Sequence, residues 1–151
     1  MRLSDDTLRE RLQSPGIAFT KDEKLKLASL VAAAGMERAL VSYPPAHWSE
    51  VEITEKIVKV RYFKEVFGLG RTLREDVDII NLTGANIALH LPFNIERFDK
   101  IEEVIKYASK LDKLVEVAIV DVFQYSARDL IGLLKKLVNL EFRLSGVCKI
   151  S

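Results

Sequence analysis

Apolar positions along the chain fall into two alternating patterns: short buried runs, and longer stretches with helical spacing. Thr20 and Glu23 have the spacing of a capping box, and apolar residues follow them at helical intervals as far as Gly35, a suitable helix end. Residues 38–43 then form a short apolar run, which predicts a strand that ends at Pro44–Pro45, because proline cannot continue a ladder of hydrogen bonds. This part of the chain therefore predicts a helix followed by a strand.

The same alternation continues along the rest of the chain. Three further residue pairs predict helix starts: Ser49 with Glu52, Thr72 with Glu75, and Ser126 with Asp129. Another helix is predicted from residue 95. Apolar runs of strand length lie at residues 1–3, 65–70, 86–93 and 114–122, and a weaker strand pattern lies at 140–150.

Strands and helices that alternate in this way predict an α/β fold. The chain holds five βα units of about 21 to 30 residues, which implies parallel strands joined by right-handed crossover connections. The spacing leaves two architectures open: part of a TIM barrel, or an open doubly wound sheet of the flavodoxin type. With 151 residues the chain is one domain, residues 1–151, and is shorter than the roughly 250 residues of a complete barrel. A barrel would therefore be incomplete, with about five to six strands.

Composition excludes several classes of protein. Apolar residues make up 48% of the chain, charged residues 30%, and the formal net charge is +1, which is typical of a soluble globular protein without a nucleic-acid-binding surface. The single cysteine, Cys148, excludes an intramolecular disulfide and suits a reducing compartment. No apolar run approaches the roughly 18 residues of a membrane span, and the first residues lack a signal-peptide pattern. We therefore expect a cytoplasmic protein that does not contact a membrane.

The clearest candidate for chemistry is the polar stretch at residues 5–16, after the first predicted strand. Ligands of α/β sheets bind where parallel strands end, and Arg9 and Glu10 lie side by side at that point. An arginine offers a planar fork to an anionic substrate, and a carboxylate is a hard oxygen ligand for a divalent metal. The alternative is an ion pair on the surface of a polar loop, which is common and contributes little.

The motif around this pair resembles a known family. The run Asp-Thr-Leu-Arg-Glu-x-x-Gln-Ser-Pro-Gly at 6–16, followed by Phe-Thr-x-x-Glu-Lys-Leu at 19–25, resembles the opening of the HMGL-like, or DRE-TIM metallolyase, superfamily. This superfamily includes isopropylmalate synthase, homocitrate synthase and hydroxymethylglutaryl-CoA lyase. The resemblance implies the N-terminal portion of a TIM barrel, a partial pyruvate carboxyltransferase-like domain that serves carboxylic acid metabolism and amino-acid biosynthesis.

The resemblance also implies an activity. It points to a transferase, a metal-dependent acyltransferase that condenses an acyl-CoA with a small-molecule 2-oxo acid. One alternative is a carbon–carbon lyase of the hydroxymethylglutaryl-CoA lyase type. Another is a non-catalytic binding or structural protein that arose by truncation or degeneration.

Individual residues acquire expected roles from the resemblance. Arg9 would be catalytic, stabilising an enolate or polarising a keto group, and Glu10 would be the first ligand of a divalent metal, which could be Mg, Mn or Zn. Gln13 would hydrogen-bond the substrate, and Arg71 and Asn94 look similar in place to substrate-facing residues. His90 lies within an alternating apolar strand, so it is either a structural histidine or a further substrate-binding residue facing the pocket.

The chain departs from the family pattern at several points. Arg11 stands where the family has glycine, and a second guanidinium beside Glu10 could compete with a metal cation. The His-x-His pair that completes the family's metal site is absent, since the two histidines, His47 and His90, are far apart. We therefore expect the chain to resemble roughly the first five-eighths of a barrel and to be incomplete for catalysis alone. The open strand edges of such a piece would favour a homo-oligomer.

Overall fold

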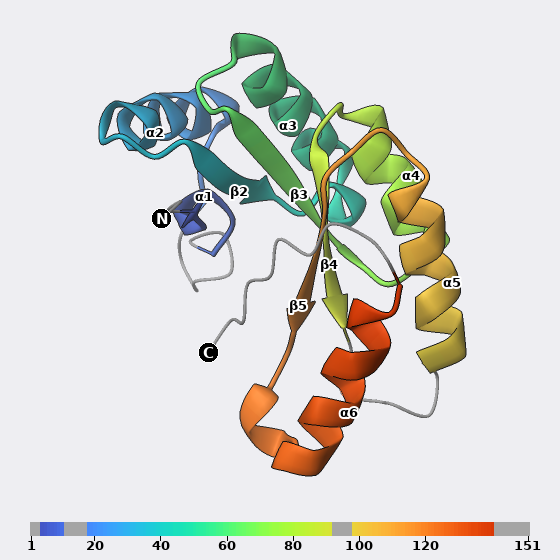
Figure 1. Ribbon diagram of the computed structural model, residues 1–151. Coiled ribbons are helices and arrows are strands. Elements are labelled where there is room, and N and C mark those ends of the chain that lie inside the picture. Colours follow the sequence, from blue (N-terminus) through green and yellow to red (C-terminus); the bar gives the residue numbers. More distant parts are fainter. Residues whose placement is uncertain (1–3, 11–17, 92–97, 141–151) are drawn as a thin grey trace.

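The computed structural model describes residues 4–10, 18–91 and 98–140 (Figure 1). Within them five strands are found: β1 (Ser4–Asp5), β2 (Arg38–Ser42), β3 (Glu65–Arg71), β4 (Asn86–Leu91) and β5 (Val115–Ile119). The helices are α1 (Thr7–Glu10), α2 (Lys21–Ala33), α3 (Trp48–Val60), α4 (Arg74–Leu82), α5 (Phe98–Ser109) and α6 (Ala127–Val138), with single 3-10 turns η2 (Pro44–Ala46) and η4 (Val122–Gln124). None of the helices in this described part is long and apolar enough to span a bilayer.

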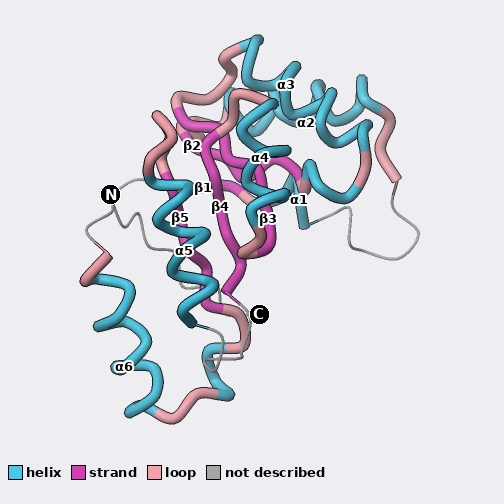
Figure 2. The backbone as a smooth tube through the Cα atoms, turned by 90° about the vertical axis from the view of Figure 1, so that its right-hand side faces the viewer, coloured by secondary structure: helices cyan, strands magenta, loops and turns pink. Residues whose placement is uncertain are grey.

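The order of the strands decides between the two predicted architectures. Neighbours in the sheet follow the order of the chain, β1-β2-β3-β4-β5, and each of these pairs is parallel. A doubly wound sheet instead reverses its strand order at a switch point. With right-handed crossovers, an unreversed order places the helices on one face and lets the sheet curl towards the other; Figure 2 shows α4 and α5 in front of the strands. The incomplete TIM barrel is therefore confirmed, and the doubly wound sheet is wrong.

The sheet has two differently covered faces because successive strand residues point to opposite sides. The helix-facing side carries the larger apolar core, which includes Val41, Ile87, Leu89 and Val117. The concave side carries a smaller cluster, whose buried members are Phe67, Leu69 and Ala88. Strand side chains that point into the interior of such a barrel belong to this second, concave side.

Two of the predicted helix starts are confirmed and two are wrong. The starts at Thr20 and Ser126 are confirmed, because each side chain accepts a backbone N–H of the first turn. Helix α3 begins earlier than predicted, since Nδ1 of His47 accepts the backbone N–H of Ser49 at 3.1 Å. Helix α4 begins later than predicted, with Leu73 at the N-cap position and no side-chain hydrogen bond there.

The beginning of the chain also differs from the prediction. The strand predicted at residues 1–3 lies outside the described residues, as does almost all of the weak strand pattern at 140–150. The predicted loop at 5–16 instead opens with the end of β1 and the short helix α1. Asp5 directs this turn, because its carboxylate accepts the backbone N–H of Thr7 at 3.1 Å and the hydroxyl of Thr7 at 3.0 Å. The turn from strand to helix brings the residues of α1 to the end of the sheet.

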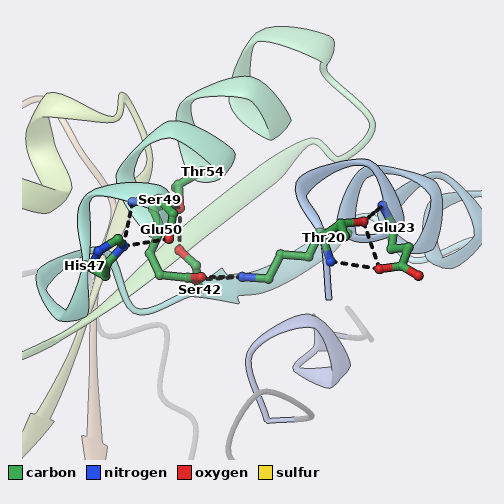
Figure 3. Close-up of polar contacts among 8 residues, drawn as sticks. Thr20, Glu23, Ser42, His47, Ser49, Glu50 and Thr54 are labelled. Atoms are coloured by element: carbon green, nitrogen blue, oxygen red, sulfur yellow. Dashed lines mark hydrogen bonds and ion pairs between the residues drawn. The ribbon is translucent and has the colours of Figure 1, made fainter. Parts of the chain in front are cut away.

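Polar contacts fasten α3 to both α2 and β2 (Figure 3). Nζ of Lys24 lies 2.6 Å and 2.7 Å from the two carboxylate oxygens of Glu50, and the side chain of Lys24 is only 4% exposed. The hydroxyl of Thr54 donates to the backbone carbonyl of Glu50 at 2.6 Å and is also hydrogen-bonded to the buried hydroxyl of Ser42. The first turn of α3 is thus tied to its two neighbours by buried polar groups.

Glycines at two alternate positions of β3 allow α4 to lie close to the sheet. A Cβ atom on Gly70 would lie 2.7 Å from Cδ1 of Ile80 and 3.2 Å from Cβ of Asp76, and one on Gly68 would lie 3.1 Å from Cγ2 of Ile80. Real Cβ atoms essentially never show a contact as short as the one at Gly70 with Ile80, and the other two distances are tighter than most Cβ contacts. The Gly68-Leu69-Gly70 sequence therefore serves helix packing, in keeping with its lack of the third glycine of a dinucleotide-binding loop.

Replacing Gly70 by alanine should lower the free energy of unfolding by about 1 to 3 kcal/mol, because the added methyl group forces α4 away from β3. Gly132 is a suitable control, since it lies inside α6 and an added Cβ would meet no atom within 4 Å. Gly132→Ala should raise the free energy of unfolding by up to about 1 kcal/mol, through the higher helix propensity of alanine. Urea denaturation measures both. A Gly70→Ala protein as stable as the unsubstituted chain would contradict the packing role.

Candidate functional site

A cavity of about 420 Å³ lies at the carboxyl ends of the strands, beside α1. Its polar lining consists of Arg9, Glu10, Tyr43, Arg71 and His90. Its remaining lining is Leu69, Gly70, Ala118, Ile119 and Val120, of which the last three come from the end of β5 and the residue after it. This is the end of the sheet at which α/β barrels bind their ligands.

The structure brings four of the six predicted site residues to this one cavity. Arg9 and Glu10 come from α1, Arg71 from the last position of β3, and His90 from β4. Gln13 and Asn94 lie outside the described residues. The cavity lies where the strand ends meet, as the sequence analysis predicted. The chemical roles of these residues stay predictions.

Arg9 is buried and held in a fixed orientation. Its side chain is 3% exposed; Nε donates to Oδ1 of Asp6 at 3.0 Å, Nη2 donates to Oδ2 of Asp6 at 2.8 Å, and Nη2 also contacts the carboxylate of Glu10. Arg9 and Glu10 do form an ion pair, as the alternative interpretation expected, but the guanidinium is removed from bulk water while the side chain of Glu10 is 38% exposed. Sequence reasoning missed Asp6, although its i, i+3 spacing to Arg9 was a usable signal.

The described residues do not build a complete divalent metal site. Among the residues that the structure describes, Glu10 is the one carboxylate that lines the cavity, and its oxygen already faces the guanidinium of Arg9. Within residues 4–10, 18–91 and 98–140, no three side chains of histidine, cysteine, aspartate or glutamate gather as metal ligands would. Divalent cations draw their affinity from several fixed ligands. The cation that opposes a metal at Glu10 is Arg9; Arg11, for which the same competition was predicted, lies outside the described residues.

The guanidinium of Arg71 is held in place by hydrogen bonds to a buried carboxylate. Asp76, on the first turn of α4, accepts the backbone N–H of Arg71 at 2.8 Å, Nε at 2.9 Å and Nη2 at 2.8 Å. The side chain of Asp76 is 2% exposed and that of Arg71 is 62% exposed. Burial alone would raise the pKa of Asp76, but the hydrogen bonds and charge of Arg71 outweigh it and hold this pKa below its usual range. Tyr43 completes the group, with its hydroxyl 3.4 Å from Oδ2 of Asp76.

Tyr43 and Asp76 were both missed by sequence reasoning. Asp76 lies in the first turn of a helix, where acidic residues are common for reasons unrelated to a site. Tyr43 directly follows β2, so its strand-end position was the available signal.

His90 faces the cavity from β4 and is half-buried. Burial lowers its pKa below the ordinary value, the positive charge of Arg9 lowers it further, and the negative charge of Asp6 opposes the shift. A histidine with a lowered pKa is neutral at pH 7, so its ring can both donate and accept a hydrogen bond. Of the two predicted alternatives, the structure supports the one in which His90 faces the pocket.

The lowered pKa of His90 predicts a dependence of stability on pH. In the unfolded chain this histidine binds a proton with a pKa of about 6.5, whereas the folded chain binds it only at lower pH. The unfolded state therefore holds more protons between the two values, and the free energy of unfolding should fall as pH drops through and below about 6.5. His90→Gln should flatten this dependence in urea denaturation at pH 5.5 and 7.5. An NMR titration midpoint for His90 at or above 6.5 would contradict the prediction.

The amino-terminal end of the same concave face is filled rather than hollow. The guanidinium of Arg38 lies 4.4 Å from the centre of the Phe67 ring, 3.7 Å from the carboxylate of Glu65 and in contact with that of Glu116. Arg38 and Glu116 are both buried. The cavity is therefore confined to the carboxyl ends of the strands.

Comparison with known proteins gives consistent results. The sequence model of the HMGL-like family matches residues 1–151. The 2-isopropylmalate synthase of Sulfolobus acidocaldarius is 31% identical over 130 residues, which cover 77% of this chain and 34% of that enzyme. Homocitrate synthase AksA of Methanosarcina acetivorans is 30% identical over 122 residues, which cover 72% of this chain and 30% of that enzyme. The chain thus spans about a third of the length of the curated relatives it matches.

A solved structure supports the fold. The HMG-CoA lyase of Bacillus subtilis superposes with a TM-score of 0.75, covering 96% of this chain and 57% of the lyase chain. The sequences are 12% identical over this superposition, so the likeness shows the architecture alone. It agrees with the incomplete barrel deduced from the strand order.

Proposed function

The chain belongs to the HMGL-like family, and we propose that it carries the 2-oxo-acid-binding part of an acyltransferase of the isopropylmalate synthase or homocitrate synthase type. One observation carries the proposal: α1 brings Arg9 and Glu10 to a cavity that Arg71 and His90 also line. In this proposal the substrates are a 2-oxo acid and an acyl-CoA, and the reaction serves amino-acid biosynthesis in the cytoplasm.

The chemistry of the reaction explains why Arg9 would matter. When an acyl-CoA enolate adds to the keto carbon of a 2-oxo acid, negative charge develops on the keto oxygen. A cation that already points at this oxygen stabilises the charge without any reorganisation of the site. The two hydrogen bonds from Arg9 to Asp6 supply such a fixed orientation. Arg9 is therefore the proposed catalytic residue.

The same proposal limits what the described residues can do alone. Relatives of this type are expected to use a divalent metal, and Glu10 is the proposed ligand, but one carboxylate that faces a guanidinium does not make a site for such an ion. We therefore expect substrate binding without efficient turnover from this chain alone.

The proposal is tested by separate measurements of binding and turnover. Isothermal titration calorimetry with pyruvate and 2-oxobutyrate should show saturable binding of a 2-oxo acid. Release of free CoA thiol from acetyl-CoA, followed with each 2-oxo acid and with Mg²⁺, Mn²⁺ or Zn²⁺, should be slow or undetectable. Failure to bind any 2-oxo acid, with or without metal, would refute the proposed function.

A non-catalytic binding protein is the second candidate. It is favoured by the contact between Glu10 and Arg9, which leaves an anion-binding cavity but opposes a metal. This candidate predicts that divalent metal at millimolar concentration leaves the affinity for a 2-oxo acid unchanged, whereas a metal-dependent transferase predicts an increase. Lyase activity, for which the fold alone argues, would appear as acetoacetate released from hydroxymethylglutaryl-CoA.

Self-association is a further part of the proposal. Among the described strands, β1 pairs with β2 alone and β5 with β4 alone, so each has an edge with no strand on it. The outward side of α6 also exposes Ile131, Leu134 and Val138. Such edges and apolar surface favour association with another chain. Sedimentation velocity should therefore show a homo-oligomer, and a monomer throughout the micromolar range would contradict this part.

A further inference from the structure

The polar group formed by Tyr43, Arg71 and Asp76 has a geometry that the proposed function does not use. We propose that this group is a carboxylate-binding unit, in which Arg71 contacts the carboxylate of the ligand and Asp76 is the residue that positions Arg71. The inference rests on the proposed function and names which side chains would hold the carboxylate of a 2-oxo acid.

Arg71 keeps donors for a ligand after it has bonded to Asp76. A guanidinium has five N–H groups in a planar fork, and Asp76 accepts one from Nε and one from Nη2. The remaining donors belong to a side chain that lines the cavity and is largely exposed. A carboxylate is a suitable acceptor for them, because arginine binds planar anions through two parallel hydrogen bonds.

The other arginine of the cavity is less suited to bind a carboxylate. Arg9 is almost completely buried and already faces two negative groups, Asp6 and Glu10. A fully charged ligand carboxylate at Arg9 would meet the repulsion of both groups, whereas the keto oxygen assigned to Arg9 is uncharged when the substrate binds. Arg71 is paired with one carboxylate, that of Asp76, which is covered by the protein, and Glu75 adds only the smallest of the charge effects on the pKa of Arg71. The charges around the cavity therefore favour Arg71 as the contact for an anionic ligand.

Asp76 is built into the fold in a way that fixes its direction. It lies 3.2 Å from where a Cβ of Gly70 would be, so the absence of a side chain at Gly70 lets the carboxylate reach back to the end of β3. Its two oxygens accept three hydrogen bonds from Arg71, including the backbone N–H. Asp76 is not among the residues that line the cavity, so it would act on a ligand through Arg71 and Tyr43, which do line it.

Tyr43 provides a second donor. Its hydroxyl lies 3.4 Å from Oδ2 of Asp76, at the long end of the range for a hydrogen bond, and its side chain lines the cavity. An incoming carboxylate can therefore accept this hydroxyl while Asp76 keeps its bonds from Arg71. The ligand contact then consists of one guanidinium and one phenol, both from neighbouring strand ends.

Calorimetry with pyruvate and its methyl ester tests the inference, because the two molecules differ in the charge of the carboxylate. The unsubstituted chain should bind pyruvate and not methyl pyruvate. Arg71→Ala should weaken pyruvate binding by at least about tenfold, Asp76→Asn by about fivefold, and Arg71→Lys by less than Arg71→Ala. Arg74→Ala is the matched control: Arg74 stacks on Tyr107 at 4.2 Å outside the cavity, and its loss should change affinity less than about twofold.

The double variant Arg71→Ala/Asp76→Asn distinguishes positioning from support of the fold. If Asp76 acts through Arg71, the second substitution adds no further loss of pyruvate affinity. If Asp76→Asn causes the same loss of pyruvate affinity in the unsubstituted chain and in the Arg71→Ala chain, then Asp76 is a structural residue and its assigned role is overturned. Urea denaturation of each variant confirms that affinity is measured on folded protein.

The remaining outcomes separate the inference from the proposed function. If Arg71→Ala binds pyruvate as the unsubstituted chain does, the inference is overturned and the proposed function stands. If the unsubstituted chain binds isobutyrate in an Arg71-dependent way but no 2-oxo acid, the carboxylate-binding unit stands and the proposed function fails. If it binds neither class of carboxylate, both are overturned.

Discussion

Glu50→Ala should lower the free energy of unfolding by about 3 to 5 kcal/mol, measured by urea denaturation. The reason is that the substitution leaves Lys24, the partner of Glu50, without its counter-charge. Lys24 is 3% exposed, and both oxygens of Glu50 bond to its ammonium group at the junction of α2 and α3. Without Glu50 a positive charge remains on a buried side chain that has lost this partner, which costs far more than the loss of an exposed ion pair.

Two further variants test whether the loss of stability in Glu50→Ala comes from a buried charge that has lost its partner. Glu55→Ala removes the carboxylate of an exposed pair on the same helix, where Lys59 lies 2.6 Å away, and should change stability much less. Lys24→Met/Glu50→Leu removes both charges and should recover most of the stability lost in Glu50→Ala. The argument fails if Glu50→Ala costs no more than Glu55→Ala.

The alternation of strands and helices could be predicted because each element carries its own pattern. The apolar run at 38–43 and the Thr20 capping box are local features, and both are found in the structure as β2 and the start of α2. The curl of the sheet could not be predicted in the same way, because strand order depends on pairing between distant segments. Only the opening motif favoured the barrel, and the length argued against a complete one. The unreversed strand order from β1 to β5 decided between the two architectures.

The start of α4 was predicted wrongly because a contact with the end of β3 takes the place of the predicted cap, whereas at α3 another local contact, between His47 and Ser49, takes its place. The predicted capping pair Thr72 and Glu75 has suitable spacing, but Asp76 bonds to the backbone and side chain of Arg71 instead, and the helix begins after Leu73. These contacts depend on the approach of α4 to β3. No spacing rule within a single helix contains that information.

The residues of the candidate site also fall into those that could be predicted from the sequence and those that could not. Arg9, Glu10, Arg71 and His90 were predicted because strand ends gather at one edge of a parallel sheet, and the cavity contains all four. Their partners, such as Asp76, depend on side-chain packing between elements and were missed. The sequence indicated where the chemistry lies better than it indicated what holds each group in place.

Arg9→Met should change the affinities for substrate and metal in opposite directions. The guanidinium donates to Asp6 and contacts Glu10, and it is the proposed contact for the keto oxygen. Its removal should weaken 2-oxo acid binding by about 10- to 100-fold, which corresponds to about 1.5 to 3 kcal/mol for hydrogen bonds from a charged group. It also leaves two carboxylates facing each other, and such a pair is a better set of ligands for a hard divalent cation.

Mn²⁺ binding followed by calorimetry, with pyruvate binding measured on the same variants, checks both directions. Arg9→Lys is the conservative comparison, since it keeps the positive charge but not the planar fork, and should therefore gain little metal affinity. Arg9→Met/Glu10→Gln should lose the gain in Mn²⁺ affinity without regaining pyruvate. A general loss of structure would weaken both ligands together, so opposite changes can come only from the charge balance between Arg9 and its two carboxylates. Unchanged Mn²⁺ affinity in Arg9→Met would show that this balance does not control metal binding.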